Sequence, residues 1–188
     1  EEDENIKYIL IFKNQGRLAG ASLPHPHTQV IGLPFIPPDV QRELDKLKES
    51  SECIYCHLIE KAEEENRILT QNKHFTVLAP YVSTTPYELM IYPREHKQCF
   101  EKMVKEEIES LSKIMSYTFR QYAEILGDFP YNYYIHTLPP RSKSKEYHWH
   151  LRILPKLSIT AGFEKGSGIY INAIDPEMAI RNLKGEKR

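Results

Sequence analysis

Histidine, serine and glutamine side chains gather within residues 22–29 at a spacing that suits phosphoryl chemistry. Residues i and i+2 of an extended chain point to the same face, so His25, His27 and Gln29 are expected on one side. Neutral imidazole is both a nucleophile near pH 7 and a metal ligand, and amide groups can hold phosphate oxygens. The segment indicates either such a site or surface histidines in a proline-rich loop.

A second candidate site is the C-x-x-C pair formed by Cys53 and Cys56. This spacing suits two thiolates on one tetrahedral Zn²⁺, with two distant histidines completing a closed, structural site. The spacing also fits a redox pair, although no βαβ pattern surrounds it. Since Cys99 is the one further cysteine of the sequence, we expect a reducing compartment and no disulfide framework. The residues alone leave the choice of histidine ligands open.

Apolar runs and alternating patterns predict the strands that must position these residues. The runs over 7–13 and 29–33 predict a hairpin whose connection includes a loop of small residues over 20–26. Further strands are predicted over 67–71, 74–79, 87–93, 131–137, 148–154 and 169–173.

Apolar residues at helical spacing predict the helices. Asp39 is expected to cap a helix over 40–50, and Gly127 to end the longest one. A glycine-bearing loop is expected over 161–168. The helices are predicted over 40–50, 58–65 and 103–126, and from residue 176 onward.

Composition limits the classes of function. The 188 residues include 25 Lys and Arg against 26 Asp and Glu, a net charge of −1, which disfavours a general nucleic-acid-binding surface. No apolar run approaches the ~20 residues that span a bilayer, so no membrane partner is expected. Hydrophobic residues at 40% and charged residues at 27% are typical of a globular domain.

The sequence contains a faint internal repeat. The units His25-Pro-His27 and His148-Trp-His150 are each followed by an apolar run and a proline. Two copies of one α+β unit, the first of them truncated, would explain this pattern. In the second unit, His150 is interpreted as a catalytically inactive copy of the His27 position.

The segment from Phe12 to Gln29 closely resembles the active-site segment of galactose-1-phosphate uridylyltransferases, the transferase branch of the histidine-triad superfamily. The resemblance returns at 147–155 and 162–168 and covers most of the chain. In this superfamily, a glutamine at position 29 in place of a third histidine distinguishes transferases and phosphorylases from hydrolases. The resemblance implies an α+β fold: a histidine-triad-like antiparallel sheet with packed helices, built from the second of two repeated halves plus the last strands of the first.

The same resemblance divides the chain. Residues 1–38 would end the first half and carry the H-x-H-x-Q motif, and residues 39–188 would form the second half with a Cys2His2 zinc site. In the family, the rest of the first half supplies the zinc partners of His25 and most of the nucleobase and ribose pocket. We therefore expect this chain, which begins without Met, to be the carboxy-terminal part of a longer enzyme.

Site roles follow from the positions that match the family motif. His27 matches the nucleophile that becomes nucleotidyl-histidine, and Gln29 matches the residue that hydrogen-bonds the phosphoryl oxygens. Substrate-binding positions are implied for Asn14, Gly20, Ser22, Phe163 and Glu164, the last two for the hexose.

The resemblance also selects metal ligands. His96 and His148 match the zinc positions that accompany Cys53 and Cys56, and His25 matches a zinc ligand of the first half. The best-known bacterial uridylyltransferases lack the second C-x-x-C. Relatives with two Cys2His2 sites include phosphorylases that act on adenylylated sugars.

The function implied is transfer of UMP between a UDP-sugar and a hexose 1-phosphate, by a ping-pong reaction through His27. The enzyme would be cytoplasmic, act in galactose metabolism with sugar nucleotides and sugar phosphates as partners, contain Zn²⁺, and be compatible with a homodimer. Two alternatives stay open. One is a sugar-nucleotide phosphorylase or adenylyltransferase of the same superfamily, and the other is a zinc-stabilised nucleotide-binding module without catalysis.

Overall fold

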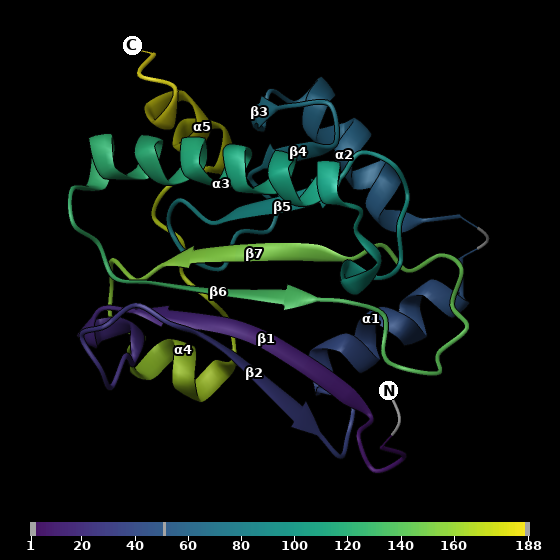
Figure 1. Ribbon diagram of the computed structural model, residues 1–188. Helices are drawn as coiled ribbons and strands as arrows, with labels where there is room; N and C mark the ends of the chain where they lie inside the picture. The colour runs from purple at the N-terminus through teal and green to yellow at the C-terminus, as the bar shows by residue number, and fades with distance from the viewer. Residues whose placement is uncertain (1–2, 51, 187–188) are drawn as a thin grey trace.

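The computed structural model describes residues 3–50 and 52–186, which form one antiparallel seven-stranded sheet with helices packed on both faces (Figure 1). The strand order is β2-β1-β6-β7-β5-β4-β3. This is the α+β class that the sequence predicts. The strands are β1 (Tyr8–Gln15), β2 (Thr28–Leu33), β3 (Ile68–Gln71), β4 (Phe75–Leu78), β5 (Leu89–Pro93), β6 (Tyr131–His136) and β7 (His150–Pro155).

The helices divide between the two faces of the sheet. The long helix α3 lies across one face together with α5, and α1 lies on the other face with α4 near the β1–β2 end (Figure 1). Short 3₁₀ turns cover Arg17–Ala19 and Phe100–Lys102. The helices are α1 (Pro38–Lys48), α2 (Ile54–Glu64), α3 (Lys105–Leu126), α4 (Gly162–Ser167) and α5 (Pro176–Leu183).

Each face of the sheet has its own hydrophobic core. Successive side chains of a strand point to opposite faces, so Leu89 and Ile91 of β5 join the core under α3 and α5. Met90 and Tyr92 of the same strand join the core under α1 and α2. The side of the sheet on which a residue lies therefore follows from its place in the alternation.

The strand register reveals an internal two-fold relation. Phe12 of β1 pairs with Gln29 of β2 on one side and with Tyr134 of β6 on the other. Tyr134 in turn pairs with Arg152 of β7. Gln29 and Arg152 are therefore at equivalent ends of one row that crosses four strands on one face of the sheet. The two H-x-H segments that suggested a repeat thus precede equivalent positions in two neighbouring hairpins.

Two helix predictions are wrong at their N-termini. The helix predicted over 58–65 begins at Ile54, inside the C-x-x-C, because the Cys53 sulfur caps it by accepting the backbone N–H of Cys56 at 3.4 Å. Asp39 does not cap α1. Pro37 is the N-cap residue and Pro38 opens the helix, where a missing N–H has no cost.

The predictions for the segment 161–173 are also wrong. The expected loop over 161–168 contains α4, which begins where the Glu164 carboxylate accepts the backbone N–H of Ala161 at 2.9 Å. The expected strand over 169–173 does not form, since the segment lies outside the sheet. Ile169, Tyr170 and Ile171 are about 60% exposed there.

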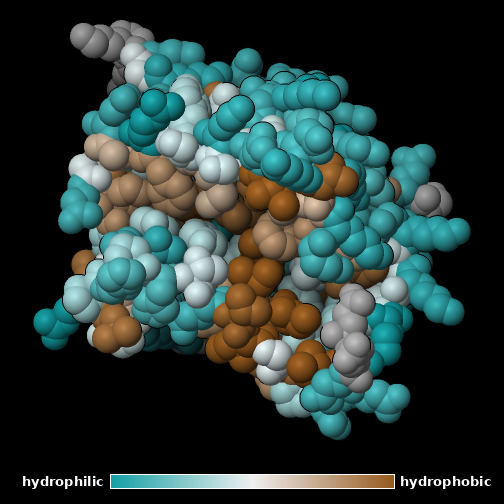
Figure 2. Space-filling model, viewed as in Figure 1, coloured by the Kyte–Doolittle hydropathy of each residue, from teal (hydrophilic) through white to brown (hydrophobic). Residues whose placement is uncertain are grey.

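The β1–β2 end of the sheet lacks a helical cover on the α3 side, and apolar side chains form a band below α3 in this view (Figure 2). On β2, an edge strand, Val30 is 66% and Ile31 is 43% exposed. Among the described residues, no helix is long and apolar enough to cross a membrane.

Candidate active site and candidate metal centre

His27 lies immediately before β2, at the end of the loop that follows β1. Its Nδ1 lies 2.9 Å from the backbone carbonyl oxygen of His25. A carbonyl can only accept, so Nδ1 must carry the hydrogen and Nε2 keeps its lone pair. The ring is partly exposed, which leaves it accessible to a ligand. This is the tautomer that a nucleophilic histidine requires.

Gln29 shares the half-buried face of this segment with His27, whereas His25 is exposed. His25 and His27 both precede β2, which begins at Thr28, so Gln29 is the member of the three that lies on the strand itself. His25 also belongs to neither group of metal-ligating side chains found in the described parts of the chain.

The loop between β1 and β2 is held by one amide side chain. Asn132 of β6 donates through Nδ2 to the Asn14 side-chain oxygen at 2.7 Å and to the Ala19 carbonyl at 2.8 Å. Gly20 has a φ of 82°, a left-handed conformation that suits glycine. Ser22 is exposed further along the loop. Of the three predicted phosphate-contacting residues, Asn14 thus lies near the end of β1, and Gly20 and Ser22 lie within the loop.

The structure brings together the four side chains that the sequence predicts as one metal site. The ligand atoms of Cys53, Cys56, His96 and His148 all lie within 4.8 Å of one another. The Cys56 sulfur is 3.6 Å from Nδ1 of both histidines. The residues come from the start of α2, the segment after β5 and the segment before β7, so the group joins three parts of the fold.

Backbone carbonyls orient both histidines of this group. His96 Nε2 lies 2.7 Å from the Lys145 carbonyl oxygen, and His148 Nε2 lies 3.0 Å from that of Pro93. Each Nε2 must therefore carry the hydrogen, which leaves both Nδ1 atoms as acceptors facing the sulfurs. Burial lowers the pKa of His148 to about 3, so its ring is neutral, the form that binds a metal. The donor set and its orientation fit a tetrahedral metal ion.

A second group of buried polar side chains was not anticipated as a unit. Glu43 of α1 accepts a hydrogen bond from His136 Nδ1 at 2.8 Å through one oxygen and from the Tyr147 hydroxyl at 2.8 Å through the other. His150 Nε2 is 3.8 Å from the same carboxylate, and this trio could also hold a metal ion. No sequence signal separates Glu43 from other helix glutamates.

Opposing effects set the pKa of Glu43. Burial raises it, but the hydrogen bond from His136, the nearby His150 and the Tyr147 hydroxyl outweigh that effect and lower it to about 2. His150 is 1% exposed, and burial lowers its pKa to about 4. Its Nδ1 lies 3.2 Å from the His148 carbonyl oxygen, and the matching distance from His27 Nδ1 to the His25 carbonyl oxygen is 2.9 Å. The copy keeps the local geometry of His27 but not its accessibility.

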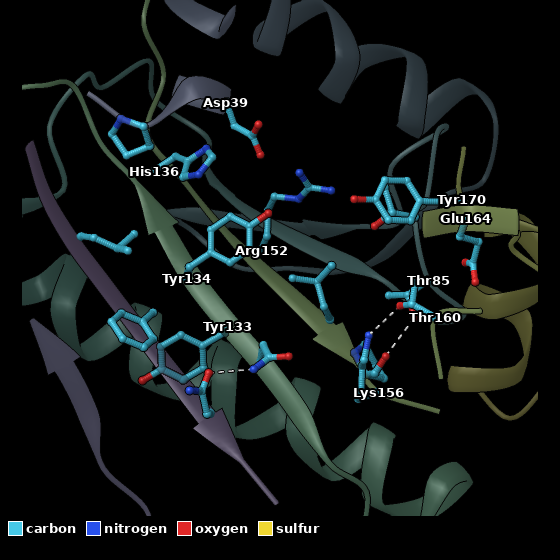
Figure 3. A pocket seen from close by; sticks show the side chains of 18 of the residues that line it. Asp39, Thr85, Tyr133, Tyr134, His136, Arg152, Lys156, Thr160, Glu164 and Tyr170 are labelled. Carbon is cyan, nitrogen blue, oxygen red and sulfur yellow. Dashed lines mark hydrogen bonds between the residues drawn. The ribbon is translucent and has the colours of Figure 1, made fainter. Parts of the chain in front are cut away.

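A cavity of about 830 Å³ lies on the α1 side of the sheet, between the start of α1 and the segment around α4 (Figure 3). Glu164 lines it, whereas Phe163 does not and is 59% exposed. Asn14 also lines it, but neither His27 nor Gln29 is among the lining residues. The structure therefore does not place the predicted hexose-binding pair and the predicted nucleophile around one cavity.

The fold and the H-P-H-T-Q segment together define a protein of the galactose-1-phosphate uridylyltransferase type. The chain belongs to the family described as "Domain of unknown function (DUF4921)", whose model matches residues 1–184.

Curated relatives are enzymes of sugar-nucleotide chemistry. ADP-glucose phosphorylase of Arabidopsis thaliana is 37% identical over 190 residues, covering 97% of this chain and 53% of the relative. Galactose-1-phosphate uridylyltransferase of Thermotoga maritima is 32% identical over 192 residues, covering 95% of this chain and 60% of the relative. The chain thus spans little more than half the length of these relatives.

Solved structures agree with this placement. A uridylyltransferase structure superposes with a TM-score of 0.91 at 30% identity, covering 99% of this chain and 62% of that one. The crystal structure of Arabidopsis thaliana ADP-glucose phosphorylase with bound ADP-glucose gives a TM-score of 0.89 at 34% identity, covering 100% of this chain and 62% of that one.

Proposed function

We propose that this chain carries the nucleophile of a nucleotidyltransferase that moves UMP between a UDP-sugar and a hexose 1-phosphate through a covalent intermediate on His27. The observation that carries the proposal is the His27–His25 hydrogen bond. It holds the hydrogen on Nδ1 and leaves the Nε2 lone pair available on a partly exposed ring. The relatives that act on galactose 1-phosphate support the substrate class.

The reaction has two displacement steps. The Nε2 lone pair of His27 forms a bond to the α-phosphorus, and the bond from that phosphorus to the bridging oxygen breaks, so the sugar 1-phosphate leaves with the electron pair. A phosphate oxygen of the incoming hexose 1-phosphate then attacks the same phosphorus. The P–N bond breaks and the electron pair returns to Nε2. Gln29 and the loop from Asn14 to Ser22 would bind the phosphoryl oxygens, which is electrostatic stabilisation of the transferring group.

Intact mass spectrometry tests the covalent step. Protein incubated with UDP-glucose, and separately with ADP-glucose, should gain the mass of one nucleotidyl group when denatured at neutral or basic pH, because phosphoramidates are acid-labile. His27→Ala should lose the adduct, whereas His57→Ala, a change of an exposed histidine on α2, should keep it. An adduct that survives in His27→Ala contradicts the proposal. Reversible nucleotide binding without an adduct would favour the non-catalytic module.

A phosphorylase is the second candidate, favoured by the 37% identical ADP-glucose phosphorylase and by the assembled C-x-x-C site. The first step would be the same, and inorganic phosphate would replace the hexose phosphate in the second. Adding inorganic phosphate or galactose 1-phosphate to the nucleotidylated protein separates the two. Release of a nucleoside diphosphate by phosphate alone supports the phosphorylase, and formation of a new sugar nucleotide supports the uridylyltransferase.

The metal centre is proposed to bind Zn²⁺ through Cys53, Cys56, His96 and His148. Two thiolates and two imidazoles are a common structural zinc set, and four protein ligands leave no open position for catalysis. Elemental analysis of the purified protein should find about one zinc ion bound per chain at this four-ligand site. Cys56→Ser should lose this zinc, and Cys99→Ser, outside the group, should retain it. Equal zinc contents in the two variants would contradict the assignment.

A further inference from the structure

Asn132 of β6 contacts the loop between β1 and β2, although the proposed reaction at His27 gives it no role. It pairs directly with Asn14 of β1 across the antiparallel strands, so the two side chains lie on the same face of the sheet. Both residues line the cavity on the α1 side of the sheet. Asn132 is therefore placed to act on a residue that is expected to contact phosphate.

The hydrogen bonds of Asn132 fix which way the Asn14 amide faces. The backbone carbonyl of Ala19 can only accept, so the Asn132 atom that lies 2.8 Å from it must be Nδ2. The second hydrogen of the same Nδ2 points to Asn14 at 2.7 Å and needs an acceptor there. Asn14 must therefore present Oδ1 to Asn132, because the flipped amide would set two N–H donors against each other.

This orientation leaves the donor side of Asn14 available to a ligand. Among the described residues, Asn14 Nδ2 has no hydrogen-bond partner, and the residue lines the cavity. Phosphoryl oxygens only accept hydrogen bonds, so the direction of the amide decides whether Asn14 attracts or repels them. A carboxamide that is free to flip would present its oxygen part of the time, whereas the one held by Asn132 presents its nitrogen.

The strand register places this donor beside the predicted nucleophile. Phe12 of β1 is paired with Gln29 of β2. Two residues further along, the same antiparallel register brings Asn14 opposite His27, which lies just before β2. Residues directly opposite each other in antiparallel strands have their side chains on one face. The Asn14 donor and the imidazole are therefore on the same side of the β1–β2 hairpin.

We infer that Asn132 is a positioning residue for the proposed transfer. It holds the Asn14 amide so that Nδ2 donates to an oxygen of the phosphoryl group at His27, and it makes or breaks no bond itself. Its second hydrogen bond, to Ala19, fixes the turn before Gly20. The inference rests on the proposed function, because it assigns Asn14 to a phosphoryl group that reacts with His27.

The rate of adduct formation tests this coupling between the two asparagines. Timed intact-mass measurements at neutral pH give the rate constant at saturating nucleotide sugar, with whichever of UDP-glucose and ADP-glucose forms the adduct. Asn14→Ala should lower it about tenfold, the effect of losing one hydrogen bond to a charged oxygen. Asn132→Ala should lower it at least about threefold, and the double variant should be no slower than Asn14→Ala alone, since the pair acts as one unit.

The matched control is Asn182→Ala, which removes a half-buried asparagine of α5 that donates to the Tyr87 hydroxyl at 3.0 Å. It should leave the rate constant unchanged. If Asn132→Ala lowers the rate by the same factor with and without Asn14→Ala, Asn132 acts only on the loop through Ala19 and the inference is overturned. A rate constant for Asn132→Ala equal to that of the control overturns it as well.

Nuclear magnetic resonance tests the orientation without substrate or substitution. In the labelled, ligand-free chain, a scalar coupling across the hydrogen bond is expected between the Asn132 side-chain nitrogen and the Asn14 side-chain carbonyl carbon. Absence of this coupling overturns the inference even where the His27 adduct forms. A coupling without any adduct on His27 overturns the proposed transfer while the fixed direction of the Asn14 amide stands, so the two failures are distinguishable.

Discussion

At the scale of single residues, Glu43 contributes most to joining α1 to the sheet through polar contacts. Its two oxygens accept hydrogen bonds from His136 on β6 and from Tyr147, just before β7. The lowered pKa of Glu43, about 2, keeps the carboxylate ionised at neutral pH, where its contribution to stability is complete. A buried charge of this kind is tolerated because both of its oxygens have donors.

Replacing Glu43 by Gln is therefore expected to lower the free energy of unfolding at pH 7 by about 2 kcal/mol, since an amide cannot accept from both donors with the strength of a carboxylate. Urea denaturation followed by circular dichroism measures the change. Glu49→Gln, the same substitution at an exposed position after α1, should change stability by less than about 0.5 kcal/mol. Similar midpoints for the two variants would show that the Glu43 contacts contribute little.

The residues of the metal group illustrate how far residue types alone can predict a site. The C-x-x-C spacing indicates two thiolate ligands, and the resemblance supplied His96 and His148. The structure adds the two carbonyls, of Lys145 and Pro93, that fix the ring nitrogens. Backbone carbonyls leave no signal in a sequence, because every residue has one.

At the scale of secondary structure, α3 is the element on which the larger core depends. Its residues Leu111, Ile114 and Tyr122 are buried against the sheet, and the Tyr122 hydroxyl donates to the Tyr87 carbonyl at 2.7 Å. The predicted helix over 103–126 is confirmed to within two residues at its start, since an amphipathic pattern of that length has few alternatives.

Shortening a side chain of α3 on the sheet side should destabilise the whole domain. Ile114→Ala, at a position that is 4% exposed, is expected to lower the free energy of unfolding by about 2 to 4 kcal/mol through lost burial and a residual cavity. Ile108→Ala, 54% exposed on the same helix, should change it by less than about 0.5 kcal/mol. Chemical denaturation of both variants provides the comparison, and equal losses would contradict the assigned orientation of α3.

Short elements were predicted less well than long ones. The helix α4 has six residues and was expected as a loop, because glycines at 162, 166 and 168 outweighed the capping glutamate in the sequence pattern. The apolar run after it was expected as a strand, yet it is not one of the seven strands of the sheet. A strand requires a neighbouring edge, and β2 and β3 are the edges of the sheet.

At the scale of the whole molecule, the metal group connects α2 to the segments before β7 and after β5. If Zn²⁺ binds there, it binds the folded state and not the unfolded one, and so it adds to stability through mass action. Treatment with a strong chelator should then lower the thermal unfolding midpoint by several degrees, and added zinc should restore it.

The variant Cys56→Ser, which lacks one ligand, serves as the control. Its midpoint should already be lowered and should respond little to the chelator. Differential scanning calorimetry of both proteins provides the measurement. A chelator effect of equal size in Cys56→Ser would place the responsible metal elsewhere, with the Glu43, His136 and His150 group as the next candidate.

The sequence by itself determined the long elements and the H-x-H-x-Q and C-x-x-C segments, because periodicity and short motifs are local properties, and the family resemblance of those segments implied the α+β class. Tertiary structure decided which distant side chains meet. It placed Glu43 between His136 and Tyr147, put Gln29 and Arg152 at opposite ends of one row, and separated Glu164 from His27. These relations depend on strand order, register and helix packing, which join residues 93 or more positions apart and leave no local pattern in the chain.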